Sequence, residues 1–165
     1  MPDSKQLRVL KKLTALLGET PGYEGIKVYR GKLVISAKDV EDTLSVLEAP
    51  RPVVGEGAGH ENHVRNETWT LFVQGWPKDD HENPSDPAYA MKAAVEKQLY
   101  KIIAVNETNG RPLYPDLYRF NKDITSLTIG QGVVRPPSDE AASRLAMFYL
   151  PLFVGIVTDI SNPYA

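Results

Sequence analysis

The sequence has no cysteine among its 165 residues. This absence excludes disulfide cross-links, thiolate nucleophiles and cysteine-ligated zinc, and it fits folding in a reducing cytoplasm. An excess of one charge is also lacking, because 19 basic residues stand against 21 acidic ones. Duplex-binding surfaces are usually basic, so direct recognition of nucleic acid is disfavoured. The only local basic group, Arg8, Lys11 and Lys12, is interpreted as a solvated helix face.

Long apolar stretches are missing as well. The longest, residues 145–157, is interrupted by Pro151 and Gly155 and is shorter than the roughly 20 residues of a membrane-spanning helix. Residues 1–5 lack the basic and then apolar pattern of a signal peptide. With 42% hydrophobic and 24% charged residues, the composition is that of a globular protein. We therefore expect one domain over residues 1–165 and no membrane partner.

Apolar periodicity predicts two amphipathic helices. Leucines recur every three or four residues over residues 7–17, after a capping residue at Asp3 or Ser4. A second helix is expected over residues 87–104, with Asp86 as its N-cap. Its apolar stripe comprises Met91, Val95, Leu99 and Ile102.

Alternating, β-branched and aromatic segments predict the strands. They cover residues 26–31, 44–48, 68–76, 124–134 and 142–159, with a short extra strand at 33–35. Pro151 favours an edge position or a bulge for the last strand, and a helix starting at Asp139 is the alternative for its first half. Gly130 and Gly132 indicate a bulge or a close backbone contact.

The order of these elements predicts an α+β fold. Helices do not alternate regularly with strands, which disfavours a doubly wound parallel sheet. We expect a mainly antiparallel or mixed sheet with two amphipathic helices packed on one face and with long loops. The loops cover residues 50–67 and 106–121, and an acidic connection covers residues 77–86. Loops this long are usually functional or disordered.

Patterns typical of catalysis are weak. His60 and His63 form an H-x-x-H pair around Glu61, but metal-binding helices place two histidines four residues apart. Asp79 and Asp80 belong to a carboxylate cluster without the glycine of a calcium loop. The sequence contains no nucleophile elbow and no phosphate-binding loop. It therefore predicts a non-enzymatic protein without metal or cofactor, and a small metal-dependent hydrolase is the less favoured alternative.

Residues 69–89 combine three features. A strand ends in Gln74-Gly75-Trp76, the acidic pair Asp79-Asp80 follows, and Asn83-Pro84-Ser85-Asp86-Pro87-Ala88 opens a helix. This combination resembles the central block of the tail-terminator, or tail-completion, proteins of long-tailed bacteriophages. The order of elements over residues 5–160 fits the same layout.

The resemblance implies a structural virion protein at the head-proximal end of the tail, made in the host cytoplasm. Copies of the chain would form a ring, expected to be a homohexamer, that caps the tail tube and stops its polymerisation. The ring would contact the tail-tube protein, the head–tail connector or neck protein and, in a contractile tail, the sheath. DNA would only pass through its lumen. Another neck protein, such as a head–tail joining or stopper protein, is the alternative.

The candidate assembly contacts lie in the loops. They comprise Val54, Glu56, His60, His63, Asp79, Asp80, Tyr114 and Tyr118.

Overall fold

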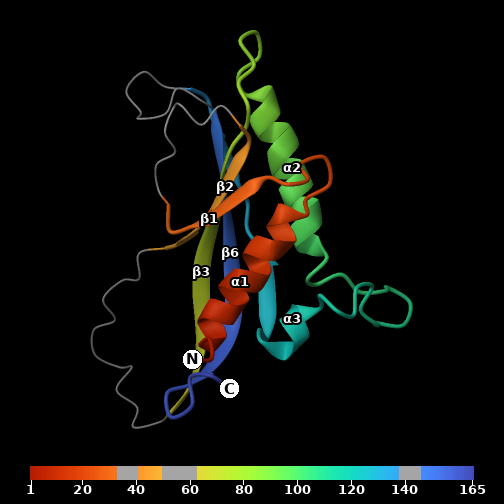
Figure 1. Cartoon of the computed structure of the whole chain (residues 1–165). Helices are drawn as coiled ribbons and strands as arrows, with labels where there is room; N and C mark the ends of the chain where they lie inside the picture. The colour runs from red at the N-terminus through yellow and green to blue at the C-terminus, as the bar shows by residue number, and fades with distance from the viewer. Residues whose placement is uncertain (33–40, 50–62, 138–145) are drawn as a thin grey trace.

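The computed structural model describes residues 1–32, 41–49, 63–137 and 146–165. Within these ranges the chain forms two layers, a sheet and a helical layer on one face of it (Figure 1). The elements are α1 (Lys5–Gly18), β1 (Lys27–Arg30), β2 (Thr43–Glu48), β3 (Val64–Trp76), α2 (Asp86–Tyr100), α3 (Arg119–Lys122), β4 (Ser126–Ile129), β5 (Val133–Arg135) and β6 (Met147–Asp159). The predicted α+β fold, with two helices on one face, is confirmed.

The sheet is mixed and, in the described part of the chain, has six strands in the order β1-β2-β3-β6-β4, with β5 also paired to β6. Only β1 and β2 are parallel among these pairs. The long strands β3 and β6 are paired in register from Val64 opposite Asp159 to Gly75 opposite Phe148. The helices pack on one face of this central strand pair.

Helix α1 forms where the leucine periodicity predicts it. The hydroxyl of Ser4 accepts a hydrogen bond from the Leu7 amide at 3.4 Å, so Ser4 is the N-cap. Leu13 and Leu17 point into the core, and the helix ends at Gly18.

Helix α2 begins one residue before the predicted start and ends four residues before the predicted end. The prediction of Asp86 as N-cap is wrong, because Ser85 occupies that position and makes no capping bond through its side chain. Asp86 instead lies in the first turn, where a carboxylate interacts favourably with the helix dipole. Pro87 fits beside it because the first amides of a helix lack intrahelical partners. Beyond Tyr100 the chain continues in turns.

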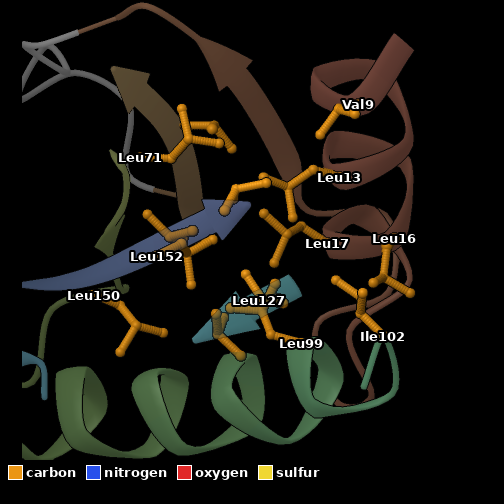
Figure 2. Packing of buried hydrophobic residues seen from close by; sticks show 14 of the residues in the cluster. Val9, Leu13, Leu16, Leu17, Leu71, Leu99, Ile102, Leu127, Leu150 and Leu152 are labelled. Atoms are coloured by element: carbon orange, nitrogen blue, oxygen red, sulfur yellow. The ribbon is translucent and has the colours of Figure 1, made fainter. Parts of the chain in front are cut away.

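The core lies between the helices and the sheet (Figure 2). Leu13 and Leu17 of α1 meet Leu99 of α2 and side chains from the central strands there. Odd-numbered residues of β3 face this core, and their partners on β6 are even-numbered. The core members of this strand pair are Trp69, Leu71, Val73, Phe148, Leu150, Leu152, Val154 and Ile156. None of the helices in the described ranges is long and apolar enough to cross a membrane.

Some strand boundaries differ from the predictions. Residues 64–67, expected in a loop, belong to β3, because β6 is long enough to pair with them despite their polar composition. The strand expected over residues 124–134 is divided into β4 and β5. Strand β6 covers Met147–Asp159, and residues 142–145 of the predicted strand lie outside the described residues. The predicted strand at residues 33–35 and the helix start at Asp139 lie outside the described residues.

Of the two alternatives predicted for Pro151, the edge position is wrong, because β6 lies between β3 on one side and β4 and β5 on the other. The bulge is confirmed on the side of β4 and β5, where the three residues 130–132 lie opposite the two residues 150 and 151. The Pro151 carbonyl accepts a hydrogen bond from Gly130 at 2.8 Å. The nitrogen of a strand residue points to the same side as its carbonyl. The missing N–H of Pro151 therefore faces the break between β4 and β5. The close contact predicted at Gly130 is confirmed, since a side chain there would meet the Pro151 ring.

Candidate functional site

The sequence-predicted contact residues do not form one site. His63 lies just before β3 and Asp79 and Asp80 lie just after it, so the 13-residue strand separates them. At a rise of about 3.3 Å per residue this separation is roughly 40 Å. Val54, Glu56 and His60 lie outside the described residues, as do the other residues of 50–62.

The acidic connection is organised by hydrogen bonds within itself. The Asp80 carboxylate accepts hydrogen bonds from the amides of Asn83 and Glu82, both at 3.0 Å, and these bonds lower its pKa. Asp79 lies 3.3 Å from the imidazole of His81. In the part of the chain that the structure describes, no group of three histidine, aspartate or glutamate side chains is placed to hold a metal ion. The acidic residues here shape the turn that leads into α2.

The segment after α2 is more regular than the predicted loop. Val105 and Pro112 form a β-bridge, and the Asn106 side chain accepts a hydrogen bond from the Thr108 amide at 2.8 Å. The result is a narrow hairpin that projects from the molecule (Figure 1).

Tyr114 and Tyr118 lie on the return path of this segment. The ammonium of Lys101 is 5.6 Å from the ring of Tyr114, which places this ring beside the C-terminal end of α2. Tyr118 precedes α3 and contacts the guanidinium of Arg119 at 5.1 Å. The two predicted tyrosines therefore lie on the helical side of the molecule.

Helix α3 is a left-handed turn, which the sequence did not predict. All four of its residues, Arg119 to Lys122, have positive φ between 48° and 72°. Such angles are unfavourable for residues other than glycine and persist only where the surroundings hold them. The buried Phe120 ring anchors the turn, and Lys12 donates a hydrogen bond to the Phe120 carbonyl at 3.0 Å.

Asp123 fastens this turn to α1. Its carboxylate pairs with Arg8 at 3.2 Å and with Lys12 at 2.8 Å, and its side chain is only 13% exposed. Burial acts to raise the pKa of Asp123, but the hydrogen bonds and charges of Arg8 and Lys12 together outweigh it and lower the pKa. The interpretation of Arg8 and Lys12 as a merely solvated face is therefore wrong, because both bind a residue more than 110 positions away. Such a distant pairing leaves no local sequence signal.

A cavity of about 270 Å³ opens between α1 and the left-handed turn. Leu16, Leu117 and Phe120 provide apolar walls, and Lys12, Glu19 and Asp116 lie around them. Lys12 already binds the Phe120 carbonyl and the Asp123 carboxylate, which hold the left-handed turn. The side chains around the cavity therefore stabilise the fold, and they do not place a nucleophile beside a base.

The outward side of α2 carries exposed tyrosine side chains. Tyr89 is 62% exposed and Tyr100 is 52% exposed, and Ala93 lies exposed between them. Leu113 and Tyr114 extend the same surface beyond the end of the helix. We call Tyr89, Ala93, Tyr100, Leu113 and Tyr114 the tyrosine ridge. Glu96, which is paired with Lys92, and the exposed Lys97 lie on the same side of the helix. Exposed tyrosines are enriched in protein–protein contacts, so this ridge is a candidate contact surface.

The sheet face opposite the helices is the second unusual surface. The side chains here alternate with those of the core and come from β3, β4, β5 and β6. We call the following set the neutral sheet face: Thr68, Thr70, Phe72, Thr128, Val133, Tyr149, Pro151 and Phe153. None of these residues is charged, and Phe153 is 39% exposed. A single-sided antiparallel sheet usually presents polar side chains to water, so this face too is typical of a contact surface.

No protein-family model matches the chain, and no curated protein matches its sequence.

Proposed function

We propose that this chain is a structural, non-enzymatic tail-terminator protein of a long-tailed bacteriophage. Its copies form a ring, a homohexamer by the resemblance, at the head-proximal end of the tail. The ring caps the tail tube, stops polymerisation and presents a surface to the neck. The observation that carries this proposal is the pair of partly exposed surfaces with aromatic side chains on opposite sides of one small domain.

The two surfaces support assembly as the main activity. Tyr89, Tyr100 and Phe153 are each more than a third exposed, although aromatic side chains gain free energy from burial. Aromatic residues are enriched in protein–protein contacts, where tyrosine adds a hydroxyl to a large apolar area. A partner that covers these side chains accounts for their exposure in the isolated chain.

The local structure of residues 69–89 supports the resemblance. Gly75 lies against the ring of Phe148, and Trp76 is buried at the end of β3. The Asn83 carbonyl then accepts a hydrogen bond from the Asp86 amide at 3.1 Å, which turns the chain into α2. Each conspicuous residue type in this block therefore has a physical role in a strand-to-helix connection.

The mechanism of termination is geometric. A contact between two different faces of the same subunit closes into a ring if its rotation is suitable. Tube growth needs stacking surfaces at both ends of each ring. A subunit that binds the tube on one side and the neck or connector on the other ends this stacking. DNA passes through the lumen without being read, and a contractile tail adds the sheath as a partner.

The test is a tube-growth assay with purified tail-tube protein. Added at the start, this chain should shorten the tubes as its ratio to tube protein rises, and added to finished tubes it should cap one end. The matched comparison is bovine serum albumin at the same concentrations. Tubes of unchanged length and with bare ends would reject the terminator function. Binding to isolated connector or portal rings in the same preparation would then favour a joining or stopper protein.

A further inference from the structure

We infer that the tyrosine ridge of one copy packs on the neutral sheet face of the next copy. This inference rests on the ring assembly of the proposed function and adds which surfaces meet in it. The occupant of each surface is thus a second copy of this chain, in a head-to-tail contact.

The positions of the two surfaces support a head-to-tail contact. The ridge lies on the outward side of the helical layer, and the sheet face lies on the opposite side of the sheet layer. A two-fold contact would need one surface that complements itself. Here the chain presents two different surfaces facing away from each other, which suits repetition in one direction. Such repetition produces a ring when it closes.

The chemistry of the two surfaces also matches. Packing a helix on a sheet repeats the contact that α2 makes with β3 and β6 within its own subunit. The eight residues of the neutral sheet face are uncharged. Arg135 lies over the Tyr149 ring at one end of this face, and Glu96 beside the ridge is paired with Lys92. The hydroxyls of Thr68, Thr70 and Thr128 offer donors and acceptors to the phenol groups of the ridge.

Charges at the ends of the two surfaces favour one orientation. Helix α2 has Asp86 at its N-terminal end and Lys97 and Lys101 at its C-terminal end. On the sheet face, Arg135 lies opposite Met147, where β6 begins, and Asp159 ends the strand. Unlike charges approach each other when the neighbour's α2 runs parallel to β6.

The dimensions allow this orientation. Helix α2 is about 22 Å long, and the strand from Met147 to Asp159 spans about 40 Å. If the helix is centred on the strand, about 9 Å of strand remains beyond each end of the helix. Arginine and lysine side chains largely bridge this distance. Within one copy α2 and β6 already run in the same direction (Figure 1). In a cyclic ring whose axis is parallel to the strands, α2 of one copy also runs parallel to β6 of the next copy. The charges at the ends of the two surfaces favour this orientation.

Cysteine cross-linking tests the contact, and the natural chain contributes no background because it has no cysteine. Ala93→Cys lies on the ridge and Thr128→Cys lies opposite Phe153 on the sheet face. The full-length variants are mixed and treated with a short bis-maleimide. We expect at least tenfold more cross-linking in the mixture than in either variant alone. A chain carrying both substitutions should give a ladder that ends at the ring size.

A second pair of reactions tests the orientation. Thr68→Cys lies opposite Gly155, toward the C-terminal end of β6. We expect it to react faster with Lys97→Cys than with Ala90→Cys of a neighbour, whereas an antiparallel helix would reverse the order.

The outcomes separate this inference from the function on which it rests. Rings without the mixed cross-link would overturn the contact and leave termination intact. Cross-linking of Ala93→Cys with itself would show a two-fold contact and also overturn the inference. Particles that remain monomeric by light scattering, alone and with tail tubes, would reject both the contact and the ring.

Discussion

At the scale of single residues, the packing around Gly75 explains why a glycine lies near the end of β3. A methyl group there would overlap the ring of Phe148, which is fully buried. We predict that Gly75→Ala lowers the free energy of unfolding by about 1–3 kcal/mol, because overpacking forces the ring or the backbone to move. Gly18→Ala is the matched control, since no atom lies within 4 Å of its added methyl group. Urea unfolding of both variants measures the difference, and equal midpoints would contradict the packing at Gly75.

Asp123 gives the fold a dependence on pH. Because its pKa is lowered in the folded state, its contribution is complete above the unfolded pKa and is lost as the pH falls through the folded pKa. We predict that Asp123→Asn costs about 1–2 kcal/mol at neutral pH, the range expected for charge-assisted hydrogen bonds that are partly shielded from water. Urea unfolding across pH 2–7 is the measurement.

The control for Asp123 is Asp116→Asn, which removes an exposed carboxylate from the same side of the molecule. It should leave the acid dependence of the parent chain intact, whereas Asp123→Asn should reduce it. An Asp123→Asn variant with the full acid dependence would show that the pairs with Arg8 and Lys12 do not stabilise the fold.

At the scale of elements, the left-handed turn α3 stores strain. Lys122 has φ of 72°, a conformation that glycine adopts without the penalty of a Cβ atom. We predict that Lys122→Gly raises the free energy of unfolding by up to about 1 kcal/mol, whereas Lys122→Val lowers it by about the same amount. Thermal unfolding of the two variants checks the sign. A glycine variant less stable than the valine variant would contradict the left-handed conformation.

The helices and most strands could be predicted because their signals are local. The leucine spacing defines α1 to within two residues, and the β-branched and aromatic run defines most of β3. Residues 64–67 were missed because their strand character comes from β6, which is far away in sequence. Pro151 alone does not distinguish an edge from a bulge, because its tolerance within β6 depends on the interruption between β4 and β5 beside it.

The candidate site could be predicted only in part. Long polar loops are typical contact segments, and the sequence indicates Asp79, Asp80, Tyr114 and Tyr118 because they lie in such loops. Of these residues, Tyr114 belongs to the tyrosine ridge. The ridge itself and the neutral sheet face depend on which side of each element faces outward, and both patterns look like ordinary core residues in the sequence. Exposure in the folded chain is what distinguishes Tyr89 and Phe153 from core aromatics.

At the scale of the whole molecule, we predict that a charge introduced in the tyrosine ridge blocks assembly and leaves folding unchanged. Ala93→Glu places a carboxylate in the middle of the ridge, where a neighbouring copy would strip its water. We expect assembly to weaken by about 100-fold, the equivalent of roughly 3 kcal/mol, with unchanged thermal unfolding of the monomer. Ala15→Glu, on the exposed side of α1, is the matched control and should assemble normally. Analytical ultracentrifugation over a concentration series measures both, and equal association would contradict the contact.

The central claim is that this chain acts by forming a ring that ends a tail tube. Negative-stain electron microscopy of the purified chain, alone and mixed with tail tubes, tests it most directly. The account predicts rings of uniform diameter, or tubes that carry an extra layer of this protein at one end only. A population that stays monomeric and leaves both tube ends bare would contradict the claim.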